Sequence, residues 1–162
     1  MKAAGLKDIK DELKNSTREE LLEHCLRLTR FKKENKELLT YRLFYSYDER
    51  DYQMEMKESI SNMFSEINTS GFYLMKKGIR KILRFTKQGI RYSDVKETEL
   101  ELLLHFCNEL VDLKPSVFHL KVLTNLFETQ VKAIEKGITK IEADLRHDYQ
   151  IELNELLNKI DR

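Results

Sequence analysis

Turn-forming residues are scarce in this chain, since its 162 residues contain only five glycines and one proline. A sandwich or barrel of short strands needs a turn about every 8 to 12 residues, and Gly and Pro supply many of those turns. Helices need far fewer breaks. Apolar residues make up 41% of the chain, which is enough to build a core and argues against intrinsic disorder. We therefore expect an all-α protein, folded as a single helical domain over residues 1–162.

Apolar residues recur three and four positions apart along the first two thirds of the chain, the spacing of one helix face. Ser16 and Glu19 have the spacing of a capping box, so a second helix is predicted to start there and either to break near Asn35 or to continue exposed. Ser93-Asp94 is predicted to supply the cap of the fifth helix. The predicted helices before Pro115 cover residues 6–15, from 16 onward, 48–68, 72–91 and 94–112.

The segment after Pro115 carries an apolar stripe from Phe127 to Ile160, in which neighbouring members lie three or four residues apart. With Ser116 as its predicted N-cap, this segment predicts one helix over residues 116–160, about 45 residues long. Gly137 is either tolerated within that helix or marks a kink. The predicted architecture is therefore an up-and-down bundle of five or six helices with a long C-terminal helix.

Sequence signatures of catalysis are absent. The chain has no phosphate-binding glycine loop, no dinucleotide-binding glycine motif, no nucleophile elbow and no zinc-binding pair of Cys-x-x-Cys motifs. We expect no cofactor and lean against an enzyme. The two cysteines, Cys25 and Cys107, form no disulfide framework, and the chain has no stretch of the roughly 20 apolar residues that a membrane span needs. Because no charged, apolar and small-residue pattern follows Met1, we expect no leader segment. We expect a cytoplasmic location and no membrane partner.

Charge is unevenly distributed along the chain, although the formal net charge is only +1. Residues 72–93 hold seven bases and no acid, whereas residues 94–112 hold six acids and one base. On a helix with about 100° per residue, six of the seven bases lie within about 100° of the circumference, opposite the apolar residues. Tyr73 lies on the same face, where its ring can stack beside cationic groups. The predicted surface for a partner or an anion consists of Tyr73, Lys76, Lys77, Arg80, Arg84, Lys87 and Arg91.

This basic surface has several possible uses. We favour a non-enzymatic interaction or scaffold protein that binds an acidic protein, or that self-associates as a homo-oligomer by pairing the basic segment 72–93 with the acidic segment 94–112. The alternative is a nucleic-acid-binding module that uses residues 72–91. The sequence pI of about 7.7 lies below the value of about 9 above which such modules usually fall. A third interpretation is that the bases only solvate an outer helix.

One histidine stands among carboxylates. On a helix, Glu101, His105 and Glu109 lie four residues apart and share one face. Two neighbouring carboxylates favour the protonated imidazole, so we predict a raised pKa for His105 and a weak affinity of the three side chains for a divalent metal. An exposed acidic face that contains a histidine is the simpler interpretation. An enzyme with a metal site in the bundle core is the remaining functional hypothesis.

Three segments of the chain carry a resemblance to known proteins, namely residues 20–28, residues 31–41 and the stretch from Ile67 to Ser93, which contains Lys76-Lys77 and Arg80-Lys81. With these segments, the chain resembles a small family of uncharacterised, all-helical conserved proteins from Bacteroidetes-type bacteria. The resemblance extends over most of the chain and implies a bacterial cytoplasmic protein. It carries no activity and no site residue over to this chain, because the family has no assigned function.

Overall fold

The computed structural model describes residues 1–160, and within them it has eight α-helices and no β-strand. The prediction of an all-α protein is confirmed. The predicted number of five or six helices is wrong, because two of the expected helices are each divided into two shorter ones. The chain divides into two compact units, Met1–Phe44 and Tyr45–Arg162, which are described separately. That residues 1–162 fold as one domain stays a prediction.

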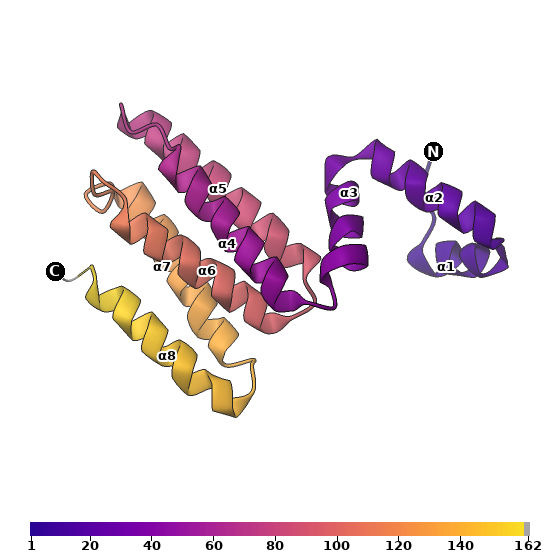
Figure 1. Ribbon diagram of the computed structural model, residues 1–162. Coiled ribbons are helices and arrows are strands. Elements are labelled where there is room, and N and C mark those ends of the chain that lie inside the picture. Colours follow the sequence, from indigo (N-terminus) through magenta and orange to yellow (C-terminus); the bar gives the residue numbers. More distant parts are fainter. Residues whose placement is uncertain (161–162) are drawn as a thin grey trace. The chain divides into compact units, whose positions relative to one another are not determined.

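The first unit holds three short helices and most of one π-helical turn (Figure 1). A capping box starts the second helix one residue later than predicted, because Ser16 is the C-cap of the first. The Thr17 hydroxyl accepts a hydrogen bond from the Glu20 amide (3.2 Å), and the Glu20 carboxylate accepts one from the Thr17 amide (2.7 Å). The predicted break near Asn35 falls at Lys32. The elements are α1 (Leu6–Asn15), α2 (Arg18–Phe31), α3 (Lys33–Thr40) and η1 (Tyr41–Tyr45).

The second unit is a five-helix bundle with α6 at its centre, in contact with each of the other four helices (Figure 1). Eight residues of α6 are buried, and they include the consecutive leucines 102–104, so that more than one side of this helix is covered. The fully buried ring of Phe106 lies 5.4 Å from that of Phe64 on α4. The helices are α4 (Glu49–Ser65), α5 (Phe72–Tyr92), α6 (Lys96–Asp112), α7 (Lys121–Ile138) and α8 (Ala143–Asn158).

The two serines predicted as N-caps do not cap the helices that follow them. The N-caps of α6 and α7 are Val95 and Leu120, and neither makes a side-chain capping bond. The Ser93 hydroxyl instead accepts a hydrogen bond from the Val95 amide (3.0 Å) and donates one to the Glu49 carboxylate (2.5 Å), which fastens this loop to α4. Ser116 lies in the irregular segment 113–120, before α7 begins.

The predicted single helix over residues 116–160 is wrong, because a turn at residues 139–142 separates α7 from α8. The apolar stripe continues through both helices, since each buries its part of it against α6. The guanidinium of Arg146 holds the turn by donating hydrogen bonds to the carbonyl oxygens of Thr139 (3.1 Å) and Ile141 (3.0 Å). Two short helices cover α6 on two sides, whereas one helix of about 65 Å would overhang the bundle.

Gly137 has a packing role and lies next to the last residue of α7. A Cβ atom built on Gly137 would lie 2.6 Å from Cδ2 of the fully buried Leu100. The glycine therefore lets α7 approach α6 closely. Neither expected role of Gly137, a kink in a long helix or a tolerated position within one, applies, because the long helix does not form.

Candidate basic surface on helix α5

The apolar side of α5 holds this helix against the bundle. Met75 and Ile79 are fully buried and Ile82 nearly so, on the side that α5 presents to α4 and α6. Thr86 is buried on the same side, and its hydroxyl donates a hydrogen bond to the Ile82 carbonyl (3.0 Å). The core thus fixes the rotation of α5 about its own axis. The opposite side is presented to solvent.

Two glycines of α5 make room for side chains of α4 and of the loop that follows α4. A Cβ atom on Gly78 would lie 2.6 Å from Cγ1 of Ile67, and one on Gly89 would lie 2.2 Å from Cε of Met56. The Gly89 carbonyl also accepts a hydrogen bond from the buried Tyr52 hydroxyl (2.8 Å). Residues that are three helical turns apart share one face, so both glycines look toward α4. The spacing of Gly78 and Gly89 is present in the sequence and could have indicated close packing on this side of α5.

The predicted basic surface is exposed along α5. Tyr73 is 71% exposed, and the Lys76 ammonium lies 5.8 Å from the centre of its ring, within cation–π range. Lys76 itself is half-buried. Among residues 1–160, no carboxylate forms an ion pair with any base of α5. The exposed bases are Lys77, Arg80, Lys81, Arg84, Lys87 and Arg91.

A groove of about 490 Å³ borders this surface where the C-terminal end of α4 meets the first half of α5. Ile67, Leu74 and Gly78 contribute apolar atoms to it. Basic side chains reach it from α5, and Lys81, which lies outside the predicted surface, is one of them. Glu66 is the acid at its edge. The surface therefore combines a convex basic stripe with a hollow that has both apolar and cationic walls.

The acidic side chains of α6 are largely occupied inside the bundle. Glu101 forms an ion pair with Lys57 of α4 and accepts a hydrogen bond from the Tyr149 hydroxyl of α8 (2.7 Å). Burial and this hydrogen bond raise the pKa of Tyr149 above its usual range. At the end of α6, Asp112 lies 3.5 Å from the Lys159 ammonium. Part of the acidic segment therefore serves contacts between helices, through Glu101, Glu109 and Asp112, although the Asp112 side chain is exposed.

A ladder of polar side chains joins α4 to α6. Four residues of α4, each four positions apart, face a row on α6, and α4 and α6 form one of the larger contacts in the bundle. Because residues four apart share one helix face, two such rows can meet along two turns or more. The α4 row is Glu49, Gln53, Lys57 and Ser61, and the α6 row is Thr98, Glu101, His105 and Glu109.

The predicted rise in the pKa of His105 is wrong. Its imidazole is half-buried between α4 and α6, and this loss of solvation lowers its pKa despite the opposing attraction of Glu109. Nε2 lies 3.1 Å from the Lys57 carbonyl oxygen, which can only accept a hydrogen bond, so the neutral ring carries its proton on Nε2. The shared face of Glu101, His105 and Glu109 was predicted, but its cover by α4 was not.

The Ser61–His105–Glu109 cluster does not have the arrangement of a hydrolytic triad. The Ser61 hydroxyl lies 2.8 Å from Nε2 and donates to the Glu109 carboxylate (2.6 Å). In a triad, Nε2 accepts the serine proton and the acid holds the other ring nitrogen. Here Nε2 is a donor and the acid engages the serine. Among residues 1–160, no group of three or more His, Cys, Asp or Glu side chains is placed to hold a metal ion, so Glu101, His105 and Glu109 do not converge on one.

Comparisons with known proteins identify no family for this chain. No family model matches it, and no match exists among curated proteins or among solved structures. The resemblance to a bacterial helical family implied several properties, and the structure shows one of them: the chain is a small all-helical protein. None of the helices within residues 1–160 has the length and apolar character required to cross a membrane.

Proposed function

We propose that this chain is a non-enzymatic interaction protein of the bacterial cytoplasm, and that the basic side of α5 binds an acidic protein partner. The observation that carries the proposal is a row of exposed bases on a helix whose rotation the core fixes, and these bases form no ion pair with any carboxylate within residues 1–160. Each exposed ion pair with a partner contributes about 0.2–1 kcal/mol, so several together provide useful affinity and fast, salt-sensitive association. The contact residues are Tyr73, Lys76, Lys77, Arg80, Arg84, Lys87 and Arg91.

The groove favours a protein over nucleic acid as the partner. Its walls include Ile67 and Leu74 beside Lys77 and Lys81, an environment that fits an apolar side chain next to a carboxylate. Self-association between the basic segment 72–93 and the acidic segment 94–112 has less support, because Glu101 and other acids of α6 already have partners in the bundle.

Nucleic acid is the second candidate for the same surface. The observation in its favour is Tyr73, whose exposed ring at one end of the basic row offers a base a stacking platform. Phosphate contacts along α5 would give an affinity that falls steeply with salt.

The test compares two charge-reversal variants of the full chain. Arg80→Glu with Arg84→Glu reverses the centre of the surface, and Lys132→Glu with Lys136→Glu makes the same change in net charge on exposed positions of α7. Fluorescence anisotropy follows binding of a Glu-rich peptide with interspersed leucines and of a single-stranded oligonucleotide. We expect the peptide to bind the wild type and the α7 variant at low salt and to lose at least tenfold in affinity for the α5 variant.

Each other result has a defined meaning. Preferential binding of the oligonucleotide, lost in the α5 variant alone, would replace the acidic protein by nucleic acid. If the α5 and α7 variants weaken binding equally, the net charge of the protein explains the binding and the α5 surface does not. Absence of binding to either probe at low salt would leave the bases as a solvated helix face and overturn the proposal.

A further inference from the structure

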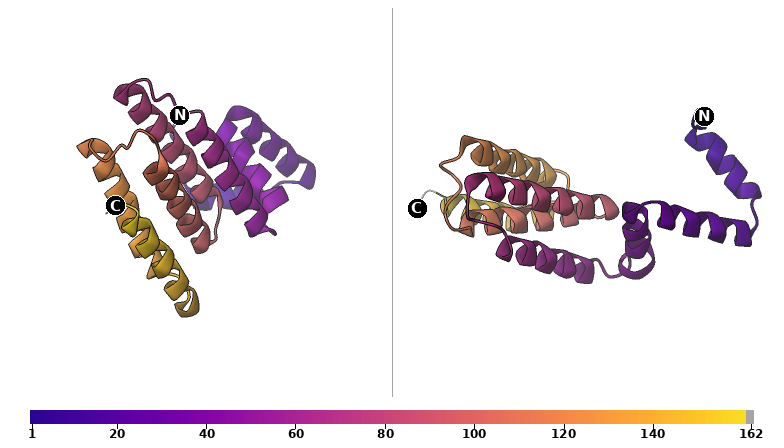
Figure 2. Two further views of the ribbon diagram at one scale, coloured as in Figure 1. Left: turned by 60° about the vertical axis from the view of Figure 1, so that its left-hand side comes forward. Right: turned by 90° about the horizontal axis from the view of Figure 1, so that it is seen from above.

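The helices of the first unit leave their apolar side chains uncovered. Within Met1–Thr40, all of which the structure describes, no residue is buried. On α2, Leu22 is 60% exposed, Leu28 is 58% exposed and Phe31 is 77% exposed. Figure 2 shows α1 and α2 diverging from the turn between them, so α1 does not cover this face. A contiguous apolar face of this kind is typical of a surface that another chain covers.

The order of charges along α2 indicates which chain that is. The first half of the helix carries Glu19, Glu20 and Glu23 against one base, Arg18, and the second half carries Arg27 and Arg30 with no acid. If two copies of α2 lie antiparallel, the acidic half of each meets the basic half of the other. A parallel pair would place like charges together. A helix that is complementary to its own reverse fits a two-fold symmetric contact, in which both subunits use the same patch.

We propose that the chain forms a homodimer in which α2 pairs antiparallel with α2 of a second copy. A two-fold axis that passes between His24 and Cys25 places Leu21 opposite Leu28 of the partner subunit and Glu19 opposite Arg30 of the partner subunit. At about 100° per residue, Glu19 and Arg30 border the same edge of the apolar face, as a pair across a two-fold antiparallel seam must. This face spans about 160° of the helix, and Arg18 and Thr29 lie within the same arc. Its apolar side chains are Leu21, Leu22, Cys25, Leu26 and Leu28.

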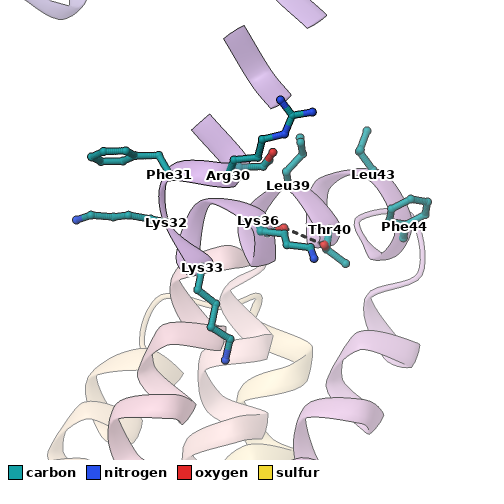
Figure 3. Close-up of a pocket in the computed structure, with 10 residues that line it drawn as sticks. Arg30, Phe31, Lys32, Lys33, Lys36, Leu39, Thr40, Leu43 and Phe44 are labelled. Atoms are coloured by element: carbon teal, nitrogen blue, oxygen red, sulfur yellow. Dashed lines mark hydrogen bonds between the residues drawn. The ribbon is translucent and has the colours of Figure 1, made fainter. Parts of the chain in front are cut away.

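The corner between α2 and α3 extends this interface. It forms an open pocket of about 520 Å³, and four of its lining side chains are basic. Figure 3 shows Phe31 and Lys32 projecting on one side of the corner and Leu43 and Phe44 on the other, with Lys36, Leu39 and Thr40 between them. In the antiparallel dimer, the acidic first half of the second α2 approaches this corner. The basic residues at the corner are Arg30, Lys32, Lys33 and Lys36.

A charge swap on the full chain tests the pairing. Glu19→Arg and Arg30→Glu each put like charges across the seam twice, whereas the double variant restores opposite charges with their places exchanged. We expect sedimentation equilibrium to show a wild-type dimer, a rise in dissociation constant on the order of tenfold for each single variant, and recovery in the double variant. Glu128→Lys, at an exposed position of α7, is the control and should leave the mass unchanged.

Oxidation gives an independent readout of the register. Cys25 is an exposed free thiol close to the proposed axis, while Cys107 is fully buried. Burial raises the pKa of Cys107 to about 12, so it stays an unreactive thiol. Diamide accepts the two electrons and two protons released when two Cys25 thiols join, and we expect it to yield a covalent dimer that Cys25→Ser abolishes.

Three results would overturn the proposal. A wild-type chain that stays monomeric at every concentration means that the rest of the same chain, or nothing, covers α2. If neither single charge variant raises the dissociation constant of the dimer, the dimer uses another surface. A dimer that dissociates on Arg80→Glu with Arg84→Glu and not on Glu19→Arg is held by α5, so this result also separates the dimer from the partner-binding surface.

Discussion

Helices α2 and α6 are similar in composition and opposite in environment. Each contains several leucines and one cysteine, yet eight residues of α6 are buried and none of α2 is. The difference lies in their neighbours, because α6 is surrounded by four helices within its unit, whereas α2 has α3 at one end. Leucine content therefore sets how much apolar surface a helix has to hide, and the topology decides whether the same chain can hide it.

The largest expected effect extends this contrast to the two units, by comparing a core residue of α6 with an exposed leucine of the first unit. Phe106→Ala removes a fully buried ring from the centre of α6 and should lower the free energy of unfolding by about 3–5 kcal/mol. Leu6→Ala on α1, where the side chain is 84% exposed, should change it by less than about 0.5 kcal/mol. Urea denaturation followed by circular dichroism measures both. A large loss for Leu6→Ala would mean that the first unit has a core of its own.

A substitution at a glycine sharpens the account of the bundle. Gly137→Ala should destabilise the protein by about 1–3 kcal/mol, because the new methyl group would collide with Leu100, although alanine favours helix by up to about 1 kcal/mol. Gly71→Ala is the matched control, since a Cβ atom there meets nothing within 4 Å. Thermal unfolding of the two variants should separate them. If Gly137→Ala proved stabilising, α7 would not be packed closely on α6.

The smallest effect concerns pH. Because burial lowers the pKa of His105, the unfolded chain takes up its proton at a higher pH than the folded chain does. The contribution of His105 to stability is thus fully present above about pH 6.5 and is lost as the pH falls from there toward the folded-state pKa. His105→Gln should remove this part of the loss, whereas His147→Gln, at an exposed position of α8, should not.

Urea denaturation at several pH values between about 7 and 5 measures this dependence. Parallel curves for the wild type and His105→Gln would contradict it. If the free energy of unfolding depended less on pH in His147→Gln than in His105→Gln, the pH-sensitive histidine would lie on α8 and not on α6.

Local signals predicted the first half of the bundle well. The start of α4 is marked by Asp48, whose carboxylate accepts a hydrogen bond from the Asp51 amide (3.1 Å), and the apolar spacing gave the extent of α5 and α6 to within a few residues. These features depend on residues close together in the sequence. The face of bases on α5 was visible for the same reason.

Features that depend on distant residues were not predictable in this way. Residues 139–142 contain neither Gly nor Pro, and the turn there depends on the Arg146 side chain and on burial against α6. His105 was assigned the correct face, but its pKa depends on α4, which covers it. The row of polar residues four apart on α4 could have been matched to that on α6, since both rows are present in the sequence.

The polar ladder between α4 and α6 has a mechanical consequence. Apolar contacts tolerate sliding, but a shift of α4 by one turn would move the Lys57 ammonium from Glu101 toward His105 and leave charged groups poorly paired. The ladder thus fixes the axial position of α4 relative to α6. The end of α4 forms one wall of the groove beside Lys77 and Lys81, so the depth of that groove is set by side chains on the opposite face of α4. Changes remote from the basic surface can therefore alter its shape.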